Sequence, residues 1–373
     1  MTSALEHGTE DTPGRLGAVL RAVGETRPVA LGRHGPWVTT TPAQARAVLT
    51  DAVGFGFPVD VSRNAMRTPH RARTEPFGAL SSRRASVASA VLAHELESAV
   101  GSTASGLDAM QLLRRPVARA TAAATLGAVD DLARDEIADA VLGWVDALGP
   151  VISAVRPPSR WSLARRRERA ARTLLESMLE NLGDPEPVGT ATMLAAGTQV
   201  PIAAGAWLLV ALAERPDLQH QLVTGAIEPT WVVWEVLRLT PPTWVTARVA
   251  RHAVELAGVR IPEGGVVLVS PLLLGRLEEL VPSVGGGPAH SLARFAPERW
   301  RDPDVRPGAW LPFGAGPHAC PGRSVGMGEL VAIAGWAGRG RLRLTGPARL
   351  DQSRGIFPRP ARFDVVAVDQ MEK

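Results

Sequence analysis

Hydrophobic and polar residues alternate along this chain mostly with helical spacing, and short β patterns interrupt them. A β-branched run changes at Pro42 to residues that favour helix, which predicts a strand followed by a helix over residues 37–51. Residues 108–147 have the pattern of helices with breaks near Gly127 and Asp130. The first half of the chain is therefore predicted to be mainly helical.

The second half adds longer helices and a group of short strands. Residues 164–183 predict a helix that stops at Gly183, and helices are expected from about 188 to 213 and from about 228 to 239. Residues 243–271 alternate with period two around the turn PEGG, which predicts short strands. The apolar run at 203–213 is shorter than the roughly 20 residues that cross a bilayer, so it predicts a buried helix and no membrane anchor.

Composition limits the architecture and the compartment. The chain has 373 residues and 45% hydrophobic content, shows no repeat or linker, and is expected to form a single domain over residues 1–373. Cys320 is the only cysteine, so no internal disulfide can form. The first 20 residues lack the basic start and apolar run of a signal peptide. We therefore expect a cytoplasmic protein.

The net charge of +4 does not predict nucleic-acid binding. Lys373 is the only lysine and tyrosine is absent, so the high isoelectric point reflects arginine alone. The densest basic run, residues 164–172, is interrupted by Glu168 and contains no aromatic residue that could stack on bases. A solvated helix face is the favoured interpretation.

The stretch FGAGPHACPG at 313–322 surrounds the only cysteine with glycines and prolines, and residues of helical composition follow it. Glycines permit tight turns and the close approach of a flat ligand, and a helix N-terminus stabilises a thiolate. A structural zinc site needs four ligands, whereas heme iron needs only one thiolate because the porphyrin supplies four donors. The alternative is a lone cysteine that acts as a small hydrophobe.

This stretch resembles the cysteine-loop signature of the cytochrome P450 family. Phe313, Gly316, His318, Cys320 and Gly322 fill every fixed position of that signature. The resemblance implies a mainly α, P450-like fold with small β-sheets, here shortened. It also implies heme b (iron protoporphyrin IX) as cofactor, with Cys320 as the iron ligand and the other four residues in contact with the heme.

Other segments match the family in the expected order. WEVLRLTPP supplies Glu235 and Arg238, one helical turn apart, and FAPERW implies that Arg299 joins them in a structural ion-pair network. Arg248 matches the arginine that holds heme propionates, with His318 as a second partner.

An early helix of the family supplies a third propionate contact, from a histidine and an arginine four residues later. Here His70 and Arg73 are three apart, which leaves the register open, and a solvated arginine is the alternative for Arg73.

The long central helix departs from the family. AAGTQVP places Gln199 at the position of the usual acid and Val200 at that of the usual alcohol, so the proton-relay pair is missing. Pro201 has no N–H for the carbonyl of Gly197, which could then hold water or substrate. In a shifted alignment Thr198 would be the alcohol. The candidate catalytic segment is Gly197, Thr198, Gln199 and Val200.

The resemblance implies a monooxygenase-like oxidoreductase that acts on a small-molecule substrate of bacterial specialised metabolism. Its electrons would come from a ferredoxin and ferredoxin reductase that dock near arginines such as Arg323, and we expect a monomer. Because the acid and alcohol are missing, one alternative is a heme-thiolate enzyme with non-standard chemistry: peroxide use, coupling, rearrangement or dehydration. The other alternative is a heme-binding sensor without turnover.

Overall fold

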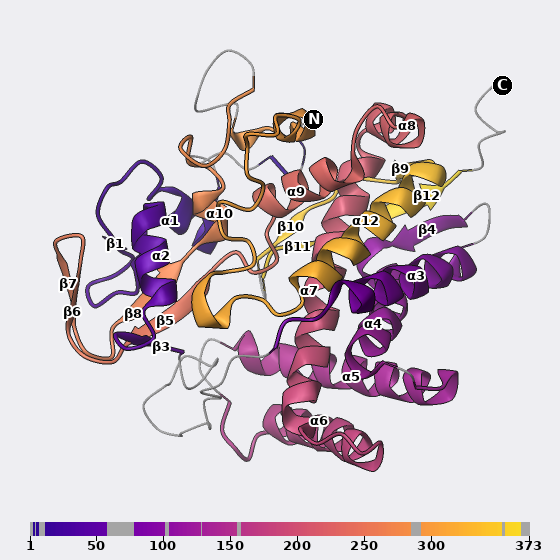
Figure 1. Cartoon of the computed structure of the whole chain (residues 1–373), viewed down its shortest axis with the longest axis horizontal. Helices are drawn as coiled ribbons and strands as arrows, with labels where there is room; N and C mark the ends of the chain where they lie inside the picture. The colour runs from indigo at the N-terminus through magenta and orange to yellow at the C-terminus, as the bar shows by residue number, and fades with distance from the viewer. Residues whose placement is uncertain are drawn as a thin grey trace. The chain divides into compact units, whose positions relative to one another are not determined.

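The computed structural model describes residues 3, 5, 6, 12–57, 78–100, 104–127, 129–154, 158–284, 292–352 and 355–366. In these ranges the chain is mainly helical with small β-sheets (Figure 1). It divides into two compact units. The first unit comprises Met1–Val61, Ala65–Gly78 and Trp234–Pro321. The second comprises Ser62–Asn64, Ala79–Val233 and Gly322–Lys373.

The first unit is built on a five-stranded sheet of order β1-β2-β8-β5-β3. Only the pair β2 and β8 is parallel; the other neighbours are antiparallel. A separate hairpin, β6 and β7, extends from this unit. The strands are β1 (Val29–Ala30), β2 (Trp37–Val38), β3 (Phe55–Gly56), β5 (Thr246–Ala250), β6 (Val254–Leu256), β7 (Val259–Ile261) and β8 (Val266–Val269).

Short helices complete the first unit. Helix α2 (Pro42–Thr50) starts where the sequence predicts, because Thr41 accepts a hydrogen bond from the Gln44 N–H and Pro42 occupies the first helical position. The others are α1 (Gly14–Leu20), α10 (Pro271–Leu274), the 3₁₀ turns η1 (Pro297–Trp300) and η2 (Gly316–His318), and α9 (Pro229–Leu239), which begins in the second unit.

The second unit is a set of long helices. Two of them meet at the break predicted near Gly127 and Asp130: Gly127 has a φ of 77° that ends one helix, and the Asp130 carboxylate caps the next. The helices are α3 (Ser82–Ala99), α4 (Ala109–Leu126), α5 (Asp131–Ile152), α6 (Leu163–Asn181), α7 (Pro187–Ala213), α8 (Pro216–Thr224) and α12 (Arg323–Arg339).

Helix α7 is the centre of the second unit. It is packed against α4, α5, α6 and α12, and residues 201–213 are buried all round. That environment explains an apolar sequence without a polar face. Among the described helices α7 alone is long and apolar enough to cross a bilayer, and 72% of its most apolar window is buried inside the protein. It is a core helix, as its sequence predicts.

Small sheets in the second unit come from segments that show no strand pattern in the sequence. Strands β4 (Ala104–Asp108), β12 (Arg362–Val365) and β9 (Leu342–Leu344) form one sheet, and β10 (Leu350–Asp351) pairs with β11 (Phe357–Pro358). The pairing of β4 with β12 joins residues more than 200 positions apart, so only the tertiary fold defines β4. The predicted mainly α fold with small sheets is confirmed.

Close packing around α7 gives a test of this core. A Cβ atom on Gly205 would lie 2.7 Å from Ile333 Cδ1 and 2.8 Å from Leu113 Cδ1, whereas Gly143 in α5 has open space around it. We expect Gly205→Val to lower the free energy of unfolding by about 1–3 kcal/mol through overpacking, and Gly143→Val to change it by less than about 0.5 kcal/mol. Urea unfolding measures both, and equal effects would contradict the packing described.

Candidate heme site

The loop that carries Cys320 lies in the first unit and is held by its own backbone. The Cys320 N–H donates to the Phe313 carbonyl over 2.8 Å, and the thiol side chain is exposed. Gly314 and Gly316 have φ values of 71° and 73°, which non-glycine residues rarely adopt. The predicted tight turns therefore exist, and they present the sulfur at the surface of this unit.

Packing against α2 requires one of these glycines. A Cβ atom on Gly316 would overlap the Leu49 carbonyl oxygen at the end of α2. Two residues after Cys320, Gly322 is the N-cap residue of α12, the helix that the composition of the following residues predicts. The cysteine thus precedes the N-terminus of a 17-residue helix, where N–H groups favour a thiolate.

Arg248 and His318 both contact one aromatic ring in the same unit, that of Phe57. The Arg248 guanidinium is 4.0 Å from the centre of the Phe57 ring, and the His318 ring meets Phe57 edge-on at 4.6 Å. Arg248 donates to Thr246 Oγ1 over 3.2 Å and to the Ala247 carbonyl over 2.9 Å. The fold therefore brings both predicted propionate partners together, and Phe57 is a residue that the sequence did not indicate.

The electrostatics of this group suit an anionic ligand. Arg248 is buried, with 4% of its surface exposed, and among the described residues it forms no ion pair with a carboxylate. Burial lowers the pKa of Arg248, and burial together with the positive charge of Arg248 lowers the pKa of His318. A carboxylate from a ligand would relieve both effects, because it favours the charged form of each group.

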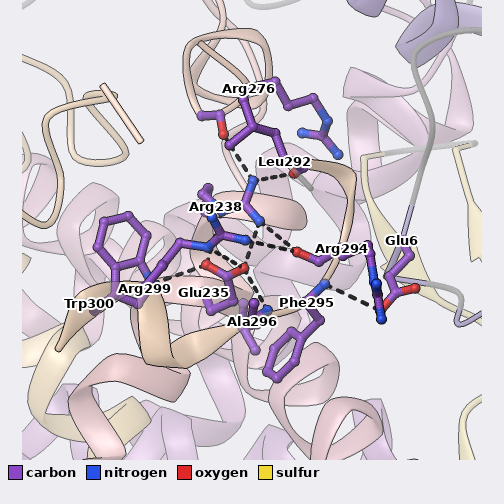
Figure 2. A network of polar contacts seen from close by, with 12 residues as sticks. Glu6, Glu235, Arg238, Arg276, Leu292, Arg294, Phe295, Ala296, Arg299 and Trp300 are labelled. Atoms are coloured by element: carbon purple, nitrogen blue, oxygen red, sulfur yellow. Dashed lines mark hydrogen bonds and ion pairs between the residues drawn. The ribbon is translucent and has the colours of Figure 1, made fainter. Parts of the chain in front are cut away.

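A buried ion network around Glu235 lies in the same unit (Figure 2). The Glu235 carboxylate accepts from Arg238 Nη2 over 2.6 Å, from Arg238 Nε over 2.9 Å and from Arg299 Nε over 3.0 Å. It also accepts from the Ala296 N–H over 2.9 Å and from Trp300 Nε1 over 3.0 Å. The geometry places Glu235, Arg238 and Arg299 in the single network that the sequence predicts.

The network also fixes neighbouring backbone segments. Arg238 donates to the carbonyls of Gly275, Leu292 and Arg294 over 2.6–3.0 Å. Burial alone would raise the pKa of Glu235, but the charges and hydrogen bonds of Arg238 and Arg299 outweigh burial and hold that pKa below its usual value. Glu235 is therefore a carboxylate at neutral pH.

Aromatic rings connect this network to the cysteine loop. Trp300 packs on Trp310 with 5.0 Å between ring centres, Trp310 meets Trp234 edge-on at 5.6 Å, and Trp234 meets Phe313 edge-on at 6.1 Å. The Phe313 carbonyl accepts the Cys320 N–H. The loop thus rests on a rigid aromatic cluster.

The candidate catalytic segment lies on α7 in the second unit. Thr192, Ala196 and Val200 are exposed at four-residue spacing and form one open face of the helix. Thr198 is fully buried instead, and Gly197 and Gln199 are intermediate. The structure therefore places Val200, but not Thr198, on the open face.

The chain matches the family model described as Cytochrome P450 over residues 230–336, which contain the Glu235 network, Arg248 and the cysteine loop. Cyclooctatin synthase from Streptomyces melanosporofaciens is 34% identical over 173 residues, 41% of this chain and 36% of the relative. Pentalenene oxygenase from Streptomyces avermitilis is 30% identical over 151 residues, 35% of this chain and 32% of the relative. The alignments span about a third of the length of these curated relatives.

Solved P450 structures share the fold over nearly the whole chain. OxyD, a P450 involved in the biosynthesis of vancomycin-type antibiotics, has a TM-score of 0.72 at 17% identity and covers 98% of this chain and 99% of its own. Open EryK from S. erythraea has a TM-score of 0.71 at 19% identity and covers 99% and 100%. Residues 230–336 thus match the cytochrome P450 family, and the chain as a whole has the fold of solved P450 structures.

The P450 family implies heme iron, and the residues present fit that group. The exposed Cys320 sulfur at a helix N-terminus suits a thiolate ligand, and Arg248 with His318 would hold the two propionate carboxylates. His70 and Arg73, the predicted third contact, lie outside the described residues. The role of each residue at the heme stays a prediction.

Two residues near α7 were missed by the sequence interpretation. Thr121 in α4 donates to the Gly197 carbonyl, and Glu329 in α12 lies 3.5 Å from the Thr121 hydroxyl; both belong to the second unit. One signal was available for Glu329, which is the only charged residue between positions 324 and 338. Thr121 gave none, because its neighbours along the chain are alanines.

The Glu235 network predicts a large loss of stability on mutation. Glu235→Gln leaves two buried guanidinium groups without their anion, so we expect it to lower the free energy of unfolding by about 3–5 kcal/mol. The matched control is Glu298→Gln: Glu298 has the same spacing to Arg301 but is exposed, and we expect a change below about 0.5 kcal/mol. Urea unfolding followed by circular dichroism measures both; a similar loss in the two variants would refute the network's role.

Replacement of Arg248 is predicted to weaken cofactor binding. We expect Arg248→Ala to weaken heme binding by about 1–3 kcal/mol, because one propionate is left without its cation. Arg260→Ala, on the exposed face of β7, is the control and should bind heme as the wild type does. Heme titration of the apoprotein measures both affinities. Equal affinities in all three proteins would show that Arg248 faces no propionate.

Proposed function

We propose that this protein is a heme-thiolate monooxygenase that oxidises a small-molecule intermediate of bacterial specialised metabolism. The observation that carries the proposal is the Cys320 loop, with its sulfur exposed and Arg248 and His318 gathered on Phe57 in the same unit. The cyclooctatin and pentalenene enzymes among its relatives support the class of substrate.

The proposed cofactor is heme b, held without covalent attachment. A c-type heme is attached through two cysteines, and this chain has one, which the proposal assigns to the iron. When bound, thiolate-ligated heme activates O₂ with two electrons and inserts one oxygen atom into a substrate. Cys320 would supply the electron-rich axial ligand, and Arg248 and His318 would orient the porphyrin through its propionates.

The proposed electron donor is a ferredoxin with its reductase. Arg323 is exposed at the start of α12, three residues after Cys320, where it could meet an acidic protein surface. We further propose a monomer in the cytoplasm.

A second candidate is favoured by the chemistry of α7. Val200, on the open face of α7, has no hydroxyl and Gln199 has no acid, so neither can supply a proton as the usual pair does. The second candidate is a heme-thiolate enzyme that uses peroxide or whose substrate supplies the proton. Turnover with hydrogen peroxide alone would favour this candidate, whereas product formed only with NADPH, a surrogate ferredoxin and its reductase would favour the monooxygenase.

Replacement of Cys320 tests whether its sulfur is the iron ligand. We expect Cys320→Ser to abolish the thiolate-type absorption spectrum of the reduced, CO-bound protein, because a hydroxyl cannot donate electron density as a thiolate does. The spectrum is recorded at equal heme content for wild type and variant. A thiolate spectrum that survives the substitution would overturn the assignment, and ligand-dependent partner binding without any product would favour a sensor.

A further inference from the structure

A buried cation of the first unit lacks an anion within the described part of the chain. Arg276 comes just after α10, belongs to the surroundings of the Glu235 network (Figure 2) and is 4% exposed. Its Nη1 donates to the Leu272 carbonyl over 2.8 Å, whereas the buried Nε and Nη2 have no hydrogen-bond partner among the described residues. A guanidinium group removed from water without a counter-charge is costly, so this side chain calls for a physical explanation.

The two atoms without partners belong to one edge of the guanidinium plane. Nε and Nη2 each direct an N–H group to the same side, and such a pair matches the two oxygen atoms of a carboxylate. Arg238 uses this edge for Glu235: its Nε donates to Oε2 over 2.9 Å and its Nη2 to Oε1 over 2.6 Å. Arg276 therefore presents, buried and unused, the same edge with which Arg238 binds a carboxylate.

No described carboxylate can serve this edge. The two oxygens of Glu235 already accept five hydrogen bonds from its network, and a carboxylate has about four lone-pair sites, so this group is fully used. Glu278 and Glu279 are the nearest acids along the chain. Both are exposed, and neither is a hydrogen-bond partner of the Arg276 edge. The partner must come from elsewhere.

The local charge also favours an anion. The buried guanidinium groups of Arg238, Arg276 and Arg299 carry three positive charges against the single negative charge of Glu235, which leaves an excess of two. Burial and the charge of Arg238 lower the pKa of Arg276 to about 9, although Glu235 opposes them. Arg276 is therefore still a cation at neutral pH, and the positive field around it attracts anions.

We propose that the Nε and Nη2 edge of Arg276 binds a small planar oxyanion of the carboxylate class, such as formate, acetate or bicarbonate. Two parallel N–H···O bonds hold this anion as Arg238 holds Glu235. The site lies outside the proposed catalytic machinery, and it does not depend on the proposed function.

The proposed site is connected to the Glu235 network through one peptide unit. Arg238 Nη1 donates over 3.0 Å to the carbonyl of Gly275, the residue before Arg276. A bound anion reduces the repulsion between the two guanidinium groups, so it stabilises the folded first unit. A ligand that binds only the folded protein stabilises it in proportion to the logarithm of its saturation term. The anion is therefore a structural ligand of this unit.

Binding is measured directly by equilibrium dialysis against radiolabelled formate at constant ionic strength. The reduced, CO-bound heme protein is used, because CO then occupies the iron and the propionates occupy Arg248. We expect one formate per chain for the wild type and none for Arg276→Gln, which lacks both the charge and the edge. Arg260→Gln, at an exposed position of β7, is the matched control and should bind as the wild type does. A wild type that binds no formate would overturn the site.

The role of the edge is tested by Arg276→Lys. Lysine keeps the positive charge but replaces the two parallel N–H groups by a single compact donor group, so we expect formate to bind about tenfold more weakly or worse. Equal affinities in wild type and Arg276→Lys would show that charge alone attracts the anion. Displacement of formate by an equal concentration of chloride would show the same. Either result would overturn the assignment to an oxyanion held by this edge.

Unfolding in urea, followed by circular dichroism, gives an independent measure. At a formate concentration about nine times its Kd, we expect the unfolding constant of the wild type to be about tenfold lower than in the same concentration of chloride. Arg276→Gln should unfold alike in the two salts. If formate and chloride act alike on the wild type as well, the proposed anion does not stabilise the fold and the proposal is wrong.

Two variants keep the test decisive. If Arg276→Gln does not fold, the comparison of Arg276→Lys with the wild type decides, because both keep a charge at this position. If the protein is obtained without heme, formate binding is measured on the Arg248→Ala apoprotein, in which the other buried arginine without a described carboxylate is removed. One formate retained by this variant supports the site at Arg276, whereas loss of all formate would assign it to Arg248 and overturn the proposal.

Discussion

The first unit depends on the ion pairs that the buried Glu235 carboxylate forms with Arg238 and Arg299. Removal of one carboxylate and two guanidinium groups from water costs several kcal/mol per ion, and only good geometry offsets that cost. Here both carboxylate oxygens are used, by Arg238, Arg299, Trp300 and the Ala296 N–H. Because the arginines also hold carbonyls from several loops, the charge that stabilises the pair also sets the course of the chain around it.

Two other buried arginines of this unit show what such a cation needs. Arg276, just after α10, donates to the Leu272 carbonyl over 2.8 Å, while its Nε and Nη2 have no partner among the described residues. Burial and the charge of Arg238 lower its pKa to about 9, although Glu235 opposes them. Arg248 is likewise without a carboxylate among the described residues, but it lies beside His318 in the loop of Cys320. A ligand carboxylate can therefore form an ion pair with Arg248, as the heme hypothesis requires.

How much the sequence predicts depends on whether the signal is local. The turn glycines around Cys320, the helix break at Gly127 and Asp130, and the Glu235–Arg238 pair are set by residues a few positions apart, and all were predicted. Phe57 and Thr121 acquire their meaning only from neighbours that are 261 and 76 positions away, so no pattern could indicate them. Strand β4 fails for the same reason, because its partner β12 lies more than 200 positions away.

Pro201 inside α7 changes the hydrogen bonding of this helix. An interior proline costs about 3 kcal/mol or more in a helix, chiefly through the lost hydrogen bond and the displaced carbonyl. This chain recovers part of that bond through Thr121, but a hydroxyl can rotate and exchange its proton, which a backbone N–H cannot do at comparable ease. The Gly197 carbonyl therefore accepts from an exchangeable hydroxyl, that of Thr121, where an unbroken helix would supply a backbone N–H. Since Gly197 has no side chain to hinder Thr121, the carbonyl that Pro201 leaves without an intrahelical donor takes its hydrogen bond from α4.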